Sequence, residues 1–516
     1  MNNSSSRYLL TPKGCDKINL NMTDQIPRAL HTRCIQPLSI GLVLLVALSC
    51  TALASSDTPQ AAKSTKTDKS YSWFTSDNLR FSGFIEAYAS TDLHKDVHTE
   101  HLKSFFNRIR AEAKYTFADP KASSLAVLQK DDPYLLVSAE SDFLWFGKDS
   151  DYSDYDLDLY ETYFHWSSGP WQLRLGKQIV RWGKTDQLSP VDNLNPEDFR
   201  RFLLDDLEDR KIPNWMGRLR FFGDQMTLEG VFIPFFEPHD IDYFGTDWAV
   251  YRHAKQDILH LPLPAELKGF VQELHVDEDD PPNTLENSQA GVRVSSTLGD
   301  IDLAASYLHA WDPMPFFQDF PIKNIEANGP LSREDIGRNP NSLTLAPGDI
   351  DVTYRRSHIY GLEFEAVFQE LGLRGESAFF DGQTFLTNNL TSTQAPVLHT
   401  VLGVDYSGEN GLYANFQLSD QEIFDYDQDI LFFKRHNISA SGELRKEWSR
   451  GTWESAIRAV YFLTDQSSHI HPKLSYKPFA PLQLTLGLHI FTGDKDTVLG
   501  QYDDNDEAYI RMKYFF

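Results

Sequence analysis

Cysteine is almost absent from this 516-residue sequence, and its three occurrences fall within the first 50 residues. They are Cys15, Cys34 and Cys50. The remainder of the chain can therefore form no disulfide bond and offers no thiolate ligand to a metal. A chain without cysteine over so great a length suits an oxidising compartment and depends on packing and hydrogen bonding alone.

Long apolar runs are also missing after residue 54, so no segment there is long enough for a membrane-spanning helix of about 20 residues. The one apolar run, 38–47, follows two arginines and precedes the small residues Ala52-Leu53-Ala54. This is the pattern of a secretory signal peptide with its cleavage site. We therefore expect residues 1–54 to be a signal peptide. Translation from Met22 instead of Met1 would give a signal of ordinary length.

Basic residues are outnumbered, at 48 lysines and arginines against 74 acidic residues, which gives a net charge of −26. So acidic a chain is not expected to bind nucleic acid. The sequence also lacks a phosphate-binding loop, a cysteine cluster and a nucleophile elbow. His469 and His471 share one strand face, but no third metal ligand lies near them in sequence. We therefore predict no enzymatic activity, no cofactor and no metal, and interpret the two histidines as pore-lining.

The last ten residues alternate between two kinds of side chain. One face is wholly apolar and consists of Ala508, Ile510, Met512, Tyr514 and Phe516, whereas the other carries Tyr509, Arg511 and Lys513. Alternation with a period of two indicates a strand between two environments, and about ten residues span the bilayer in a transmembrane barrel. The segment resembles the C-terminal signal of Gram-negative outer-membrane proteins, which the barrel-assembly machinery reads. Tyr514 and Phe516 are the residues that carry this resemblance.

The same alternation recurs from residue 79 to the end of the chain. Residues 55–78 are polar and without periodicity, so we expect a disordered periplasmic lead-in before the first strand. The pattern predicts 18 strands, with 16 as the alternative count. The expected ranges are 79–90, 104–117, 134–146, 157–166, 171–181, 214–222, 226–235, 289–298, 301–311, 359–368, 372–380, 397–406, 412–419, 437–445, 452–463, 470–477, 482–491 and 507–516.

The lengths of the connections alternate along the chain as well. Every second connection is short, as at 223–225, 299–300 and 450–451, whereas the others are longer and reach extremes at 236–288 and 312–356. Short turns on one rim and long loops on the other are typical of outer-membrane barrels. One connection, 118–133, is long for a periplasmic turn. Residues 79–516 are therefore predicted to form an all-β, transmembrane, antiparallel up-and-down β-barrel.

The third outer loop, 182–213, contains a predicted helix at 195–209. An Asn-Pro-Glu-Asp start offers a capping residue, a proline in the first turn and two acids at the positive end of the helix dipole. The segment combines an apolar stripe with dense charge, which suits a position between a wall and water. A barrel of this width needs an element that narrows it. We expect this helix to form the constriction; a helix lying on the outer rim is the alternative.

Three short motifs near this loop resemble a poorly characterised family of porin-like outer-membrane barrels of proteobacteria. The motifs are Gly176-Lys177-Gln178, Trp182-Gly183 and Asn195-Pro196, within a matching stretch of about 175–242. Some members of that family are encoded beside exporters of the resistance-nodulation-division type. The resemblance implies the barrel and makes an inner-membrane exporter a possible partner, but it implies no particular solute.

Charged residues are predicted on the inner face of the barrel. The candidates for the pore lining and its constriction are Arg108, Arg110, Arg174, Arg200, Arg201, Arg218, Arg220, Glu112, Glu140, Asp142 and Asp206. They can form a field across the pore that selects solutes by charge. They can equally be ion pairs that satisfy a polar lumen, and the sequence leaves both interpretations open.

Aspartates are dense in the predicted outer loops, notably at 149–154, 277–280, 425–429 and 494–506. None of these loops has the full spacing of a calcium-binding hand. We interpret them as solvated acidic surfaces, bridged by divalent ions to lipopolysaccharide, with calcium binding as the alternative.

The sequence thus predicts an exported protein of the Gram-negative outer membrane that allows diffusion or weakly selective passage of small solutes. Two alternatives remain. A partner of an inner-membrane exporter or lipid-transport system would have a hydrophobic lumen. A barrel enzyme, which is less expected, would carry a Ser–His pair at its outer rim.

Overall fold

The structure is a computed structural model, and it describes residues 75–76, 78–93, 102–117, 133–147, 152–260, 262–273, 276–319, 322–324, 343–345, 350–388 and 391–516. The expected signal peptide and most of the lead-in lie outside the described residues. Within the lead-in, Thr75–Ser76 form the short strand β1, which pairs with the start of β2. The described residues therefore include one short strand before residue 79. No helix among the described residues is long and apolar enough to cross a membrane.

Eighteen strands form the wall, which confirms the predicted number and overturns the alternative of 16. They are β2 Leu79–Asp92, β3 Ser104–Thr116, β4 Tyr134–Phe146, β5 Tyr152–Ser168, β6 Trp171–Gln178, β7 Asn214–Phe222, β8 Met226–Ile233, β10 Gln289–Leu298, β11 Ile301–Asp319, β14 Ile350–Phe368, β15 Leu371–Leu386, β16 Ser392–Ser407, β17 Leu412–Ile423, β18 His436–Trp448, β19 Trp453–Phe462, β20 Ser468–Phe479, β21 Leu482–Thr492 and β22 Glu507–Phe515.

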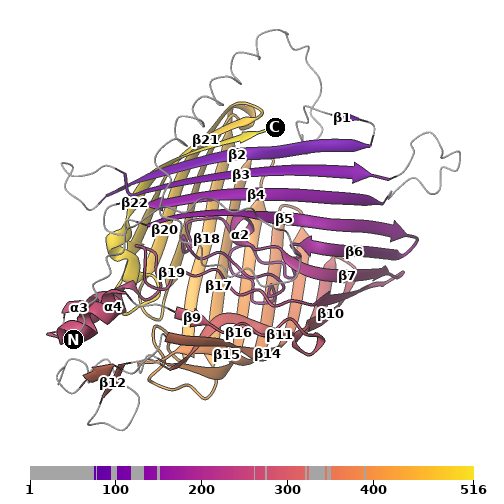
Figure 1. Cartoon of the computed structure of the whole chain (residues 1–516). Helices are drawn as coiled ribbons and strands as arrows, with labels where there is room; N and C mark the ends of the chain where they lie inside the picture. Colours follow the sequence, from indigo (N-terminus) through magenta and orange to yellow (C-terminus); the bar gives the residue numbers. More distant parts are fainter. Residues whose placement is uncertain are drawn as a thin grey trace, which may run out of the picture. The chain divides into compact units, whose positions relative to one another are not determined.

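The wall is closed by its first and last strands. Each strand pairs antiparallel with the next along the chain, and β22 pairs with β2 from Phe84↔Phe515 to Asp92↔Glu507. The terminal residue completes this seam, because Gly83 donates its amide to the Phe516 carbonyl at 2.9 Å and Phe516 donates back at 3.0 Å. Figure 1 shows β22 and β2 side by side, with β3 to β7 following in sequence order. The fold is a closed antiparallel up-and-down barrel without a free edge.

Smaller elements belong to the long loops. They are α2 Leu207–Arg210, α3 Arg252–His260, α4 Ala265–Gln272, β9 Val276–Glu278, η1 Leu285–Asn287, β12 Ile322–Asn324, β13 Leu343–Leu345 and η4 Gly500–Asn505, with η3 Ser449–Gly451 in a short turn. β9 adds to the barrel by pairing in parallel with the start of β14. Strands β11 and β14 extend eight or nine residues beyond the predicted ranges on the long-loop side, so the wall is taller there than the sequence indicated.

The two faces of the wall differ as the alternation predicted. Leu362, Phe416 and Ile510 exemplify the outward positions and are 63%, 54% and 51% exposed. So continuous an apolar surface is unfavourable in contact with water, and lipid is the environment that suits it. Exposed aromatic residues cluster next to the short turns, at Trp166, Trp171, Phe222, Phe368, Trp448, Trp453 and Phe479. Such a girdle marks one membrane interface.

Short turns join the strands on the aromatic side. Gly299 adopts φ +65° in the two-residue turn between β10 and β11, where a side chain would be strained. The other connections on this side include 223–225, 369–370 and 408–411, whereas the opposite rim carries 179–213 and 234–288. Loop parity therefore holds along the described chain. Most of 118–133, the one long connection expected on the short side, lies outside the described residues.

This parity predicts how protease added to whole cells will act. We expect cleavage within 236–288 and within 312–356, since these segments belong to the long-loop rim. The turn 408–411 should be spared, because the opposite rim faces the periplasm. Mapping the fragments by mass spectrometry checks the orientation, and early cleavage in the short turns would invert it.

The seam predicts how the barrel will respond to changes in its last strand. Deleting Phe516 removes both backbone hydrogen bonds to Gly83, and Tyr514→Asp places a charge on the lipid-facing side. A charge there costs up to roughly 2–4 kcal/mol, with less near the interface. Both variants should reduce the amount of heat-modifiable, folded barrel in outer membranes. Normal amounts from both would show that neither closure nor recognition by the assembly machinery depends on these residues.

Apolar clusters also lie on the inner face of the wall, at the long-loop end. One contains Tyr88, Phe106, Phe146 and Phe491 from the wall together with Leu204, Trp248, Leu499 and Tyr502 from three loops. A second packs Leu267 and Val271 of α4 against Phe317, Ile350 and Val352. The long loops therefore fold into the mouth of the barrel, where their apolar side chains form shared cores with those of the wall.

A candidate permeation pathway

The connection between β6 and β7, residues 179–213, is termed here the crossing loop. Its predicted helix over 195–209 is wrong except for its last turn, α2. The two limbs of the loop pair with each other instead. Asp198 donates its amide to the Arg210 carbonyl at 2.8 Å, and Ile212 donates to the Pro196 carbonyl at 2.9 Å. These strand-like hydrogen bonds use backbone groups that the helix would have needed.

Asn195, the expected helix cap, ties the base of the crossing loop together. Its side-chain oxygen accepts from the Val180 amide at 2.8 Å, and its amide group donates to the carbonyls of Gln178 and Ile212 at 3.1 and 2.9 Å. Asn195 is 4% exposed. These partners lie 15 and 17 positions from Asn195, so its side chain holds the two ends of the loop side by side and does not cap a helix.

The first limb of the crossing loop packs against one side of the wall. Trp182 is 1% exposed and donates its indole N–H to Glu229 of β8 at 2.8 Å. Val180, Val191 and Leu194 join it in an apolar cluster with wall residues of β7, β8, β11 and β15. This limb is therefore anchored both by burial and by a hydrogen bond to a charged group.

Glu376 of β15 binds the next turn of the crossing loop. One carboxylate oxygen accepts from the Thr185 amide at 2.6 Å and from its hydroxyl at 2.8 Å, and also from the Lys184 amide. The other accepts from the Ser189 hydroxyl at 2.8 Å. Glu376 is 2% exposed. A buried carboxylate surrounded by donors is a strong contact, since hydrogen bonds to a charged group are the more stable kind.

Asp186 continues this line of contacts toward β17. Its carboxylate lies 3.0 Å from Nη1 of Arg374, and it accepts from the Tyr413 hydroxyl at 2.7 Å and from the Asn415 amide at 3.1 Å. The three partners come from β15 and β17. The loop has thus reached wall strands far from β6 and β7 in the order of the barrel.

The tip of the crossing loop reaches the opposite side of the wall. Arg201 lies between the rings of Tyr88 and Phe106, at 4.2 and 4.6 Å from their centroids. Asp205 lies 2.8 Å from Arg201 and 3.2 Å from Arg511 of β22.

Two further contacts hold the segment around α2. Asp206 forms an ion pair with Arg458 of β19 and lies 3.7 Å from Lys473 of β20. Arg108 of β3 donates to the Asp209 carbonyl at 3.2 Å. Because the crossing loop contacts β8, β15, β17, β19, β22 and β3, it passes through the lumen from one side to the other, and Figure 1 shows α2 within the ring of strands.

The pKa values of the acids in this loop are shifted in opposite directions. Burial opposes ionisation of Glu197, but Lys211 and Arg210 outweigh it and lower the pKa of this carboxyl to about 2. Burial likewise opposes ionisation of Asp206, yet Lys473 and Arg458 bring its pKa well below the usual range. Burial raises the pKa of Asp192 despite Lys211 nearby. Glu197 and Asp206 therefore remain charged at neutral pH and keep their ion pairs.

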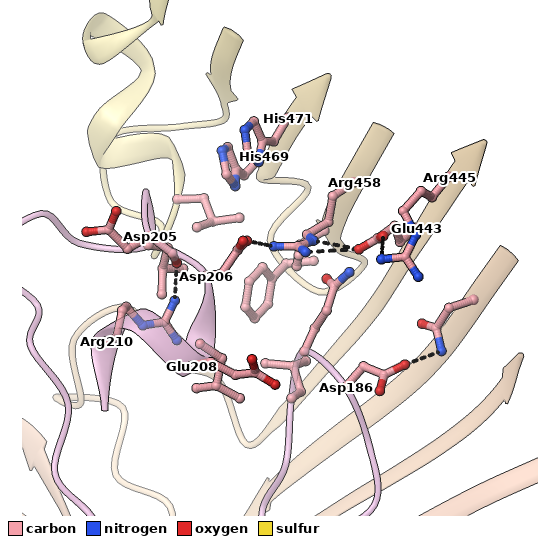
Figure 2. A pocket seen from close by; sticks show the side chains of 18 of the residues that line it. Asp186, Asp205, Asp206, Glu208, Arg210, Glu443, Arg445, Arg458, His469 and His471 are labelled. Carbon is pink, nitrogen blue, oxygen red and sulfur yellow. Dashed lines mark hydrogen bonds and ion pairs between the residues drawn. The ribbon is translucent and has the colours of Figure 1, made fainter. Parts of the chain in front are cut away.

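Between the crossing loop and the wall strands β17 to β20 lies a cavity of about 410 Å³, termed here the wall cavity. The loop lines it with acids, including Asp186, Asp205, Asp206 and Glu208, and the wall with Glu443, Arg445 and Arg458. Figure 2 shows Asp206 joined to Arg458, which is joined in turn to Glu443. The lining thus contains a chain of alternating charges across the cavity.

A second cavity of about 170 Å³ lies toward the short-turn side and is termed here the lower cavity. Lys473, Arg511 and Lys513 line it from the wall. Asp206 and His471 line both cavities. The two spaces therefore adjoin at the ion pair of Asp206, the point where the loop comes closest to β19 and β20.

The predicted pore-lining residues fall into two groups. Of the eleven, only Asp206 is among the residues that line these two cavities. The other ten contact residues of the wall or of the loops. Within the wall, Arg108 pairs with Glu140 and Asp142, Arg110 with Glu140, Arg218 and Arg220 with Glu229, Arg174 with His165, and Glu112 with Ser82. In the crossing loop, Arg200 pairs with four aspartates and Arg201 with Asp205. Most of the predicted pore-lining charges are thus neutralised by ion pairs with other side chains of the protein.

Sequence reasoning missed residues that do line the wall cavity. Glu208 was placed in the predicted helix but not as a candidate, and Tyr413 and Asp186 were not singled out. The inward parity of β17 could have identified Tyr413, whereas nothing in the sequence indicates that Asp186 would meet it. Phe516 and Tyr514 lie in the seam strand as expected, but their recognition by the assembly machinery stays a prediction.

The two histidines that the sequence placed on one face lie close to a third. His469 and His489 are 3.0 Å apart between ring nitrogens, and His471 lies 2.8 Å from the Tyr509 hydroxyl. Within the described chain, however, no group of three or more histidines, cysteines or acids is arranged to hold a metal ion. Figure 2 shows His469 and His471 side by side at the edge of the wall cavity.

Taken together, a closed 18-strand barrel with an apolar outer face and a loop folded through its lumen defines a porin-like outer-membrane β-barrel. The chain belongs to the family described as "Protein of unknown function (DUF1302)", which it matches over residues 60–452. No curated protein sequence matches it.

The chain is similar to several solved structures at very low identity. OccAB1 of Acinetobacter baumannii is 9% identical, covering 87% of this chain and 99% of that one, with a TM-score of 0.46. OccD3 (OpdP) of Pseudomonas aeruginosa is 9% identical over 87% and 93%, with a TM-score of 0.44. OmpF of Salmonella typhi, solved with daunomycin, is 8% identical over 85% and 98%, with a TM-score of 0.39.

Proposed function

We propose that this protein is an outer-membrane channel through which small solutes diffuse, with the crossing loop as its constriction. The observation that carries the proposal is the course of that loop through the lumen, which leaves a charged cavity along β17 to β20. A barrel of 18 strands is wide enough for an aqueous passage unless an internal element narrows it. The paired charges next to the cavity provide the polar surface that hydrated solutes need.

An apolar conduit, as expected for a partner of an exporter or lipid-transport system, is less well supported. The apolar clusters on the inner wall are mostly buried against the loops, as in Leu204, Trp248 and Tyr502. Packing of this kind stabilises the folded mouth of the barrel and does not expose a continuous apolar track.

A barrel enzyme would need more than the Ser–His pair that is present. The Ser419 hydroxyl lies 2.8 Å from Nε2 of His399. Ser419 is, however, 3% exposed, and within the described residues Nδ1 of His399 makes no hydrogen bond to an orienting group. A nucleophile requires both access to substrate and an oriented base. The pair is therefore interpreted as a buried wall contact.

Single-channel recording in planar bilayers tests the proposal. Refolded barrel that has passed a heat-modifiability check should give discrete, ohmic steps in potassium chloride. Folded protein without any conductance would contradict the channel. Matched recordings of empty bilayers with detergent exclude leaks.

A further inference from the structure

The wall cavity differs in character along its length. Toward the long-loop rim it is bounded by apolar side chains, namely Leu203 of the crossing loop, Val460 and Phe462 of β19, and Val498 and Leu499 of the 493–506 loop, and Leu207 of the crossing loop also lines the cavity. Toward the short turns it is bounded by Glu443, Arg445, Tyr413 and Asn415. The position of Val460 and Phe462 at the end of β19, and of Tyr413 at the start of β17, fixes this order.

The apolar end of the wall cavity remains partly open. Leu203, Val460, Phe462 and Val498 pack against a buried core but are only half-buried themselves. Water in contact with such a surface is displaced favourably by an apolar group, at roughly 25 cal/mol per Å² of area covered. A passage adapted only to small hydrated ions has no need of this surface. The apolar band therefore favours solutes with an apolar body.

The charges along the wall cavity are mostly paired, with one clear exception. Asp206 and Glu443 pair with Arg458, Asp186 with Arg374, and Asp205 with Arg201 and Arg511. Glu208 is exposed in α2, lines the cavity and makes no ion pair or hydrogen bond with any other described residue. Arg445 has a weak partner, since its guanidinium lies 3.7 Å from Glu443. The carboxylate of Glu208 thus has no partner, and Leu207, the residue before it in α2, is an apolar residue of the same cavity lining.

The loop at the long-loop end of the cavity is acidic. This loop, 493–506, supplies Val498 and Leu499 to the lining and contains five aspartates and one lysine. A net negative charge near the mouth raises the local concentration of cations. Cations are thus concentrated where the apolar band begins, and Glu208 offers them a partner farther along.

We propose that the wall cavity selects amphipathic organic cations, that is, protonated amines attached to an apolar body. The inference rests on the proposed channel function and specifies its substrate class. The apolar band takes the body of the solute, and Glu208 pairs with its ammonium group.

Four probe ions test separately the preference for an apolar body and the preference for a positive charge. They are methylammonium, benzylammonium, acetate and benzoate. Reversal potentials in planar bilayers give their permeabilities relative to potassium. Benzylammonium should permeate better than methylammonium despite its larger size, whereas benzoate should not exceed acetate. Size-ordered permeabilities for the cations, or an equal gain from the phenyl ring of benzoate over acetate, would overturn the inference.

Two variants assign the effects to residues. Glu208→Gln should lower the permeability of both ammonium ions about two- to fivefold, the range of one exposed ion pair. Phe462→Ser should remove the preference for benzylammonium over methylammonium and leave methylammonium unchanged. Leu207→Ser serves if the Phe462 variant does not fold. Glu409→Gln removes the same charge in the exposed 408–411 turn and serves as the matched control.

The outcomes distinguish this inference from the function on which it rests. Absence of all current, including that of potassium chloride, from folded protein contradicts the channel and with it the inference. Normal potassium chloride current without preference for benzylammonium contradicts only the inference. An effect of Glu208→Gln no larger than that of Glu409→Gln would overturn the role of the carboxylate.

Discussion

Removal of the crossing loop should raise the conductance of the channel severalfold. Gln178 and Asn214 are paired across β6 and β7, so a short Gly-Ser turn can replace residues 179–213 without changing the register of the wall. The loop occupies the lumen between β8 and β22, and its loss should widen the passage through the 18-strand barrel. The wall keeps its own strand hydrogen bonds and its lipid-facing surface. Single-channel conductance of the refolded variant measures the effect.

Loss of selectivity should accompany the larger conductance. Solutes in the widened lumen pass farther from the wall charges, which are screened over about 10 Å at 0.1 M salt. The ratio of cation to anion permeability should therefore move toward the value in bulk solution. Heat-modifiability and circular dichroism verify that the variant is folded. A folded variant with unchanged conductance would place the constriction elsewhere.

The strands were predictable because their signal is local. In each of them, one face must meet lipid and the other the lumen, so alternation along as few as eight residues, as in β6 and β8, is sufficient. The alternation of short and long connections then indicated which ends of the strands form each rim. The extended upper parts of β11 and β14 were missed because their residues pair above the membrane, where the alternation no longer has to be apolar.

The crossing loop was only partly predictable, for the opposite reason. Its position in the lumen was expected from its composition, but its conformation depends on distant partners. Thr185 binds Glu376 across 191 positions of sequence, and Asp206 binds Arg458 across 252. Segment 195–198 has the local pattern of a helix start, yet tertiary hydrogen bonds from Asn195 decide its structure. Local propensity is a weak guide where such contacts compete with it.

Arg200 and Arg201 show that the roles of the predicted pore-lining residues also depend on distant partners. Their charge suggested a pore lining, but Arg200 lies within ion-pair distance of Asp142, Asp154, Asp198 and Asp240. Arg201 is 4% exposed beneath aromatic rings. Both therefore bind other residues of the loops and the wall. Among the acids that line the wall cavity, Glu208 makes no ion pair with any other described residue, and such differences in pairing are not visible in sequence.

Replacing Glu376 should release the crossing loop without removing it. Glu376→Gln retains the shape of the side chain but loses the charge that accepts from Thr185 and Ser189. Each buried donor left without a good acceptor costs about 1–3 kcal/mol. The first turn of the loop should then exchange between docked and undocked positions. We expect rapid fluctuations of the single-channel current between the native level and a higher one.

A matched variant distinguishes release of the loop from damage to the wall. Glu363 is 5% exposed and pairs with Arg293 of β10, so Glu363→Gln removes a similarly buried carboxylate whose ion pair lies within the wall. It should leave the current steady, because the crossing loop keeps its contacts with Glu376 and Arg374. Fluctuations in both variants would indicate a general loss of rigidity. A steady native current in the Glu376 variant would mean that Trp182 and the contacts of Asp186 hold the loop without it, since these anchors flank the turn on both sides.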